Sequence, residues 1–255
     1  DRSNAIAIAK VDGQVFSLLL LPEKNHLVIG TMSGGLHIID LNARKEIHYI
    51  TYHEQSIFDI KRYEHQLLVA SKDGTLSVWS EQDYSLQRVV TISDLSLRMI
   101  GLHPLREEAA IACSDNSTYL LDLVHWKIEA VLQGPSNSVF SVAFIPDSEK
   151  LVAGSRDAQL YVYDLKTRQL EKQIKAHLFT INHLQFIDEN KYIATASRDK
   201  TIRIWDAETF DLVKSLDKEK SNGHINSVNR LLWIPSKSVL LSASDDRSII
   251  AWKID

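Results

Sequence analysis

Three sets of histidine, serine and aspartate recur along the chain, and these are the residue types of a nucleophilic hydrolase. The sets are His53, Ser71 and Asp73; His177, Ser197 and Asp199; and His224, Ser244 and Asp246. A tryptophan follows each set, at Trp79, Trp205 or Trp252, and a buried indole N–H needs a hydrogen-bond partner. Recurrence beside a tryptophan favours a structural network over three catalytic triads. The G-x-S-x-G turn that presents a nucleophilic serine is also missing from the sequence.

Other chemistries have less support in the composition. The ten histidines are scattered, and the single cysteine, Cys113, cannot supply a paired thiolate, so we expect no metal site and no cofactor. One cysteine is typical of a reducing compartment, and we expect a cytoplasmic protein. The net charge of -4 makes nucleic-acid binding improbable, and no apolar stretch approaches the roughly 18 to 20 residues of a membrane span.

The positions of these residues reveal an internal repeat. Four prolines are each followed nine residues later by a small or hydroxylated residue, at Thr31, Cys113, Ser155 and Ser244. Extending the frame gives six copies, and each copy ends in a large apolar residue. These residues are Ile39, Trp79, Leu121, Tyr163, Trp205 and Trp252. A period of about 42 residues is typical of a repeat architecture.

Each copy has the pattern of short strands. Apolar segments such as Leu67 to Ser71 end in turn residues, and Thr75 to Trp79 alternates polar and apolar residues. Asp73-Gly74 predicts a two-residue type I′ hairpin turn. The residue before the hydroxyl position is always small, as in Gly30 and Gly154, which indicates a strand crowded by a neighbouring sheet. About four strands per copy predict an all-β propeller with six four-stranded blades.

The residues resemble the WD40-repeat β-propeller family over almost the whole chain. The resemblance lies in Ala176-His177, Ser197, Asp199 and Trp205-Asp206, and in the matching residues of the second and sixth copies. It implies that histidine, serine, aspartate and tryptophan form a hydrogen-bonded structural tetrad in those three blades. The other copies lack the histidine, with Val11 and Pro135 at its place in the first and fourth. We therefore expect these blades to depend on apolar packing.

The resemblance also implies a binding surface on the top face, around the mouth of a central channel. One set of residues is expected to point toward the mouth: Phe16, Phe58, Arg98, Phe140, Asn182 and Asn229. A second set, just before the turn aspartates, is expected further out and includes Lys72, Arg156 and Arg198. Arginine and aromatic residues dominate the energetics of many interfaces. A structural alternative is that the aromatic residues only fill the channel.

These observations predict a non-catalytic scaffold for protein–protein interaction. The expected partner is a peptide or protein loop with acidic or phosphorylated side chains, to which arginine can form bidentate contacts. The alternative is an enzyme or a small-molecule or metal sensor that uses the channel.

The repeats define one domain over residues 1–255. The expected blades span about 11–50, 51–92, 93–133, 134–175, 176–217 and 218–255, and 5–9 is an additional outer strand. Pairing of 5–9 with 248–253 would close a ring of six blades. Alternatively, the chain is part of a seven-bladed parent that lacks its first blade.

Overall fold

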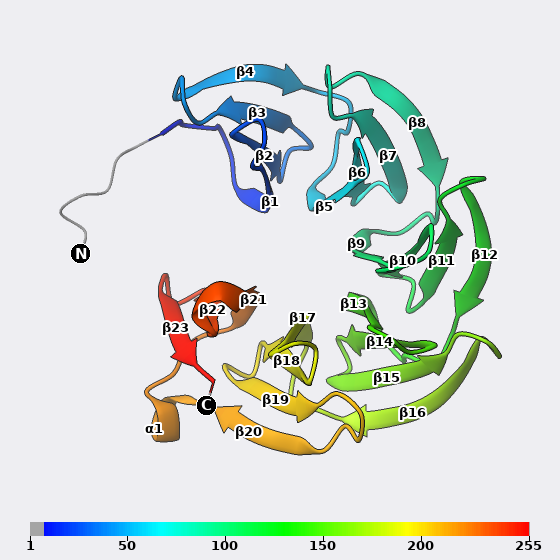
Figure 1. Ribbon diagram of the computed structural model, residues 1–255, viewed down its shortest axis with the longest axis vertical. Coiled ribbons are helices and arrows are strands. Elements are labelled where there is room, and N and C mark those ends of the chain that lie inside the picture. Colours follow the sequence, from blue (N-terminus) through cyan, green and yellow to red (C-terminus); the bar gives the residue numbers. More distant parts are fainter. Residues whose placement is uncertain (1–7, 255) are drawn as a thin grey trace. The chain divides into compact units, whose positions relative to one another are not determined.

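A computed structural model describes residues 8–254 of the chain, which form six antiparallel β-sheets within two compact units (Figure 1). The units comprise Asp1–Ile100 and Gly101–Asp255. Each sheet is one blade, and the fold is the predicted all-β propeller of six blades. Five blades have four strands, and the sixth has three among the described residues.

The first unit contains blades one and two. Blade one consists of β1 (Val15–Leu21), β2 (His26–Thr31), β3 (Leu36–Asp40) and β4 (Lys45–Ile50). Blade two consists of β5 (Ile57–Tyr63), β6 (Gln66–Ser71), β7 (Thr75–Ser80) and β8 (Leu86–Thr91). Between them lies a core in which Val28 and Ile38 pack with Ile57, Leu67 and Trp79.

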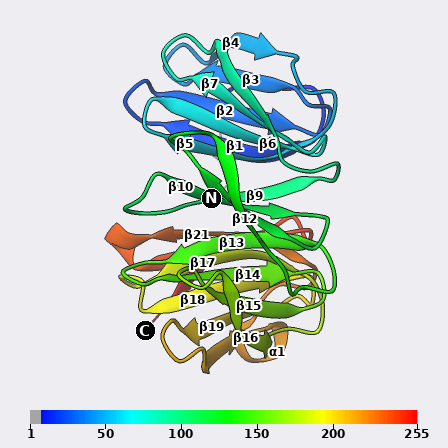
Figure 2. The same ribbon diagram turned by 90° about the vertical axis from the view of Figure 1, so that its right-hand side faces the viewer.

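The second unit contains most of blade three and all of blades four to six. Blade three consists of β9 (Leu97–Leu102), β10 (Glu108–Cys113), β11 (Thr118–Asp122) and β12 (Lys127–Leu132). Blade four consists of β13 (Val139–Ile145), β14 (Lys150–Ser155), β15 (Gln159–Asp164) and β16 (Gln169–Lys175). Blade five consists of β17 (Ile181–Ile187), β18 (Tyr192–Ser197), β19 (Ile202–Asp206) and β20 (Leu212–Leu216), and its strands β17 to β19 run alongside one another in Figure 2.

Blade six consists of β21 (Val228–Ile234), β22 (Val239–Ser244) and β23 (Ile249–Lys253). Two short helical turns flank its first strand, α1 (Lys218–Ser221) and the 3₁₀ turn η2 (Pro235–Lys237). In the described part of the chain, neither helical turn has the length that a membrane crossing needs. The predicted outer strand 5–9 falls mostly outside the described residues, so its pairing with 248–253 stays a prediction.

The turn between the second and third strands differs from the predicted type I′ hairpin. In blade two the N–H of Gly74 bonds to the carbonyl of Ser71, and only Gly74 has a positive φ, of 84°. A type I′ turn needs a positive φ at both central residues, whereas this one is a type I turn closed by one left-handed residue. The same left-handed position occurs in every blade, at Gly34, Gly74, Asn116, Ala158, Lys200 and Arg247.

Close packing of neighbouring blades explains why a small residue precedes the hydroxyl position. A Cβ atom added at Gly154 would lie 2.7 Å from Cγ2 of Ile181, the first residue of the next blade. At Gly30 the corresponding distance to Ile57 is 2.5 Å. Both distances are too short for an unstrained contact, so these positions require glycine unless the neighbouring strand moves.

Equivalent residues on one face of blades five and six differ in solvent exposure. Ile202 and Ile249 each lie three residues after the turn aspartate, yet Ile202 is 1% exposed and Ile249 is 73% exposed. Ile202 packs against Val228 and Leu231 of the following blade. The same chemical position therefore contributes to a core in one blade and faces solvent in the other.

This difference predicts unequal effects of one substitution at equivalent positions. Ile202→Ala should lower the free energy of unfolding by about 2–5 kcal/mol, because it removes buried methyl groups and leaves a cavity. Ile249→Ala should change it by less than about 0.5 kcal/mol. Urea unfolding followed by circular dichroism measures both values. Equal losses would contradict the exposed position of Ile249.

Candidate functional site

The turn aspartates organise one edge of each of five blades, which we call the top edge: the edge with the turn between the second and third strands. In blade five, Oδ1 of Asp199 accepts hydrogen bonds from the N–H and the hydroxyl of Thr201, at 3.0 and 2.7 Å. Asp73, Asp115, Asp157 and Asp246 each accept the same backbone bond from the residue two positions later. The aspartate thus closes its own turn with one oxygen and keeps the other for the rest of the blade.

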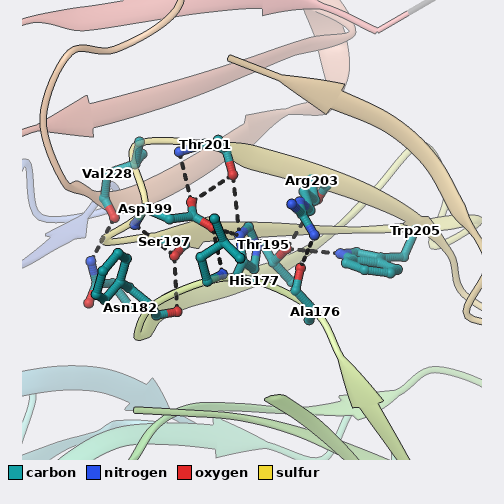
Figure 3. A network of polar contacts seen from close by, with 12 residues as sticks. Ala176, His177, Asn182, Thr195, Ser197, Asp199, Thr201, Arg203, Trp205 and Val228 are labelled. Atoms are coloured by element: carbon teal, nitrogen blue, oxygen red, sulfur yellow. Dashed lines mark hydrogen bonds and ion pairs between the residues drawn. The ribbon is translucent and has the colours of Figure 1, made fainter. Parts of the chain in front are cut away.

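In blade five, the second oxygen leads into a buried chain of side chains (Figure 3). Oδ2 of Asp199 lies 2.9 Å from Nδ1 of His177, and Nε2 of His177 lies 2.8 Å from the hydroxyl of Thr195. The indole of Trp205 donates to the same hydroxyl at 2.9 Å. The network links the turn to the strands behind it.

Blades two and six contain the same kind of chain. His53 lies between Asp73 and Ser77, and Trp79 donates to Ser77 at 2.8 Å. In blade six, His224 links Asp246 to Ser242, and Trp252 donates to Ser242 at 2.8 Å. The structure therefore brings the predicted histidine, aspartate and tryptophan together in all three blades.

The predicted hydroxyl of the tetrad was wrong in each of these blades. The partner of the histidine is Ser77, Thr195 or Ser242, and not Ser71, Ser197 or Ser244. The latter serines bond to backbone instead: Ser197 donates to the carbonyl of Phe179 and accepts the N–H of Asp199. Alternate residues of β18 share one face, so Thr195 and Ser197 lie on the same side of the strand, but only Thr195 bonds to the imidazole, while Ser197 lies next to the turn and bonds to its backbone.

Blades three and four were expected to depend on apolar packing because they lack the histidine. This expectation was incomplete, since each of them also has a polar network. The phenol of Tyr119 donates to Oδ2 of Asp115 at 2.6 Å, and that of Tyr161 donates to Oδ2 of Asp157 at 2.8 Å. Each tyrosine stands four residues after its aspartate, on the third strand. A tyrosine hydroxyl thus takes the place of the missing histidine as the partner of the aspartate. This spacing was the signal in the sequence that could have revealed it.

Burial sets the electrostatics of these networks. Burial lowers the pKa of His177, and this outweighs the opposing effect of Asp199. Burial also acts to raise the pKa of Asp199, but hydrogen bonds from His177, Leu178 and Thr201 hold it well below its usual range. In blade four, burial and the bond to Asp157 raise the pKa of Tyr161 to about 12, so the phenol keeps its proton at neutral pH.

A β-bulge in the first strand positions the residues predicted to point toward the mouth. In blade one the register shifts between Val15 and Ser17, so Phe16 has no partner on β2. The register shifts in the same way at the equivalent residues Phe58, Phe140, Asn182 and Asn229. A bulge re-aims the extra side chain away from the regular alternation of the strand.

Two groups of these bulge residues contact one another. In the first unit, the rings of Phe16 and Phe58 stack at 5.5 Å, and the guanidinium of Arg98 lies 4.4 Å from the centre of the Phe58 ring. In the second unit, Asn182 bonds to Asn229, and Asn229 donates to Asp245 at 2.6 Å. Phe140 is half-buried.

The predicted contact residues of the outer set are exposed, whereas most of those of the inner set are half-buried. Lys72, Arg156 and Arg198 are exposed, and none of them forms an ion pair with a residue that the structure describes. At the opposite edge of the blades, Arg62, Arg106 and Arg168 do form ion pairs with acidic residues. Available positive charge is therefore present on the top edge of both units.

The histidines of the three networks are engaged within their blades. Both imidazole nitrogens of His53, His177 and His224 are hydrogen-bonded there, one to the turn aspartate and the other to the hydroxyl of Ser77, Thr195 or Ser242. Within residues 8–254, histidine, cysteine and acidic side chains do not gather in a group of three or more that could hold a metal ion. Cys113 is fully buried.

The four-stranded blades with their His–hydroxyl–Trp–Asp networks define a WD40-type β-propeller. A family model described as "Nucleolar protein 10-like, N-terminal domain" matches residues 102–254, which is more than half of the chain. The chain belongs to this family. No curated protein matches it.

Substitutions in blade four test whether tyrosine replaces the histidine. Tyr161→Phe should lower the free energy of unfolding by about 1–3 kcal/mol, because Asp157 loses a buried donor. Tyr163→Phe is the matched control: the Tyr163 hydroxyl is buried without a hydrogen-bond partner among the described residues, so its removal should be neutral or stabilising. Thermal and urea unfolding measure both changes. A neutral Tyr161→Phe would contradict the replacement.

The lowered pKa of His177 predicts a pH-dependent loss of protection in blade five. A histidine with a folded-state pKa below that of the unfolded chain, about 6.5, contributes stability that is complete above that pH and declines below it. Blade four has no histidine in its network and should not respond in this range. Hydrogen exchange at pH 7 and pH 5, corrected for intrinsic rates, should show the loss in β18 and β19 but not in β14 and β15. Equal losses in both blades would contradict the assignment.

Proposed function

We propose that the protein is a non-catalytic scaffold that binds a peptide or protein loop at the top edge of its blades. The propeller fold is suited to protein interaction, because rigid sheets hold many loops at one edge. We further propose that this partner carries acidic or phosphorylated side chains.

The unpaired cations of the top edge carry this proposal. Lys72, Arg156 and Arg198 are exposed on the residue just before the turn aspartate, and the bonds of the aspartate hold that turn in place. A partner anion would therefore meet a charge on a backbone that is already ordered, which reduces the entropic cost of binding. Arginine adds bidentate geometry for carboxylate or phosphate.

The inner bulge residues have a different role in the proposal. Phe16, Phe58 and Arg98 pack on one another, so they form a half-exposed platform in the first unit. Asn182 and Asn229 satisfy each other and the nearby backbone, so they contribute shape more than affinity. The outer cations are thus the residues on which partner binding depends most.

We further infer that the protein functions in a reducing compartment. Its single cysteine is buried, which is compatible with the predicted cytoplasmic location and equally with the nucleus. The family description names a nucleolar protein, and this favours the nucleus over the cytoplasm.

Charge reversal on the top edge tests the proposal. The protein carrying Arg156→Glu and Arg198→Glu should lose its bound proteins by about tenfold or more, because two exposed cations of the top edge become repulsive. Lys45→Glu with Lys166→Glu is the matched control, since both residues are exposed and the net charge changes equally. Quantitative mass spectrometry of affinity-captured material from the native cells measures the change. Unchanged capture by the top-edge variant would contradict the proposal.

A further inference from the structure

Exposed apolar side chains alternate with the cations along the top edge of the second unit. The residues, which we call the mixed strip, are Arg156, Leu178, Phe179, Arg198, Lys200 and Ile225. Leu178, Phe179 and Ile225 are 77%, 58% and 62% exposed. Blade four has the polar Ser136 and Asn137 where blade five has Leu178 and Phe179. The apolar residues are therefore not a requirement of the repeat itself.

Backbone hydrogen bonds hold the first two segments of the mixed strip side by side. The N–H groups of Ala176 and His177 bond to the carbonyl of Ala158, at 3.1 and 3.0 Å. The turn of blade four, which carries Arg156, therefore lies beside the segment that leads into Leu178. The turn that carries Arg156 and the segment just before the exposed Leu178 and Phe179 are thus neighbours in one unit.

The loop with Leu178 and Phe179 is held at three points. The N–H of Leu178 donates to Asp199 at 3.0 Å, and the carbonyl of Phe179 accepts the hydroxyl of Ser197 at 3.1 Å. The N–H of Arg198 bonds to the carbonyl of Thr180 at 2.9 Å. Two large apolar side chains are thereby presented to solvent from an ordered backbone, directly beside Arg198.

The second half of the strip repeats this arrangement. Lys200 and Ile225 line the same open hollow between the turn of blade five and the start of blade six. The N–H of Ile225 donates to Asp246 at 3.1 Å, as that of Leu178 does to Asp199. Glu219 and Lys218 also line the hollow, and the exposed Asp245 ends the run of cations at blade six.

From this alternation we propose that the mixed strip recognises an extended peptide segment in which acidic side chains alternate with large apolar ones. This inference rests on the proposed function and adds the apolar half of the recognition. Exposed apolar side chains on an ordered loop gain free energy when a partner covers them, and the flanking Arg156, Arg198 and Lys200 select acidic neighbours. None of these three cations has an ion-pair partner within the described chain.

A peptide fits this surface better than a nucleic acid does. Sequence-tolerant binding of single strands uses aromatic side chains that stack on the bases, and the strip offers a single aromatic residue beside the aliphatic Leu178 and Ile225. Three cations are also fewer than a protein normally uses to bind the phosphates of a nucleic-acid backbone. The exposed apolar residues of the strip contribute to binding only when the partner covers them with apolar side chains of its own.

Selection from a random library of twelve-residue peptides, displayed on phage and applied to the immobilised protein, tests this proposal. The enriched sequences should combine aspartate or glutamate with large apolar residues. A synthetic copy of an enriched peptide should bind Leu178→Ser with Phe179→Ser about tenfold or more weakly, measured by fluorescence anisotropy. Leu105→Ser is the matched control, because Leu105 is 80% exposed at the opposite edge, and it should bind normally. Thermal unfolding checks that all variants are folded.

The outcomes separate this inference from the proposed function. If Arg156→Glu abolishes peptide binding while the Leu178 and Phe179 variant binds normally, the top edge binds acidic peptides, and the proposal that the mixed strip also recognises apolar side chains is wrong. If neither change has an effect, both proposals fail. Failure to enrich any peptide, enrichment of peptides without acidic residues, or binding of a uridine dodecamer in place of peptide would each overturn the mixed strip.

Discussion

The hydrogen bonds of the turn aspartate are the interaction on which the rest of each top edge depends. One carboxylate oxygen closes the turn between the second and third strands, and the other reaches into the blade or to the preceding loop. A buried carboxylate without these donors would be costly, so turn, loop and buried partner must form together. Blade one lacks the aspartate, and there Ser33 bonds to Thr31 instead, in a smaller version of the same closure.

This constraint connects stability to the binding surface. The same carboxylate that holds His177 in the blade also fixes the backbone N–H of Leu178, an exposed residue. In blade four the corresponding carboxylate holds Tyr161 and the N–H of Ser136. The buried partner can therefore change from histidine to tyrosine while the loop keeps its position. Side chains on the loop are then free to vary from polar to apolar, and this variation produces the mixed strip.

Much of the fold could be predicted from the sequence, because a period of about 42 residues with alternating apolar strands has few structural solutions. The histidine, aspartate and tryptophan of three blades were also predictable from their fixed spacing. The hydroxyl was not, because serine recurs at one position while the true partners lie on β18, β22 or β7. Tyr119 and Tyr161 were missed since their position is occupied by Ser77 in blade two and Arg203 in blade five. The turn type was missed because Asp-Gly suits both alternatives.

Site-resolved hydrogen exchange of the amides of Ser136, Leu178 and Ile225 tests the central claim most directly. All three belong to exposed loop residues, and each donates to a turn aspartate at 2.9 to 3.1 Å. An exposed loop amide without a bond exchanges rapidly, so the account predicts protection comparable to that of the strand amides behind the loop. It predicts this for the tyrosine blade as well as for the two histidine blades. Rapid exchange at these amides, with the strands still protected, would show that the aspartates do not hold the top edge.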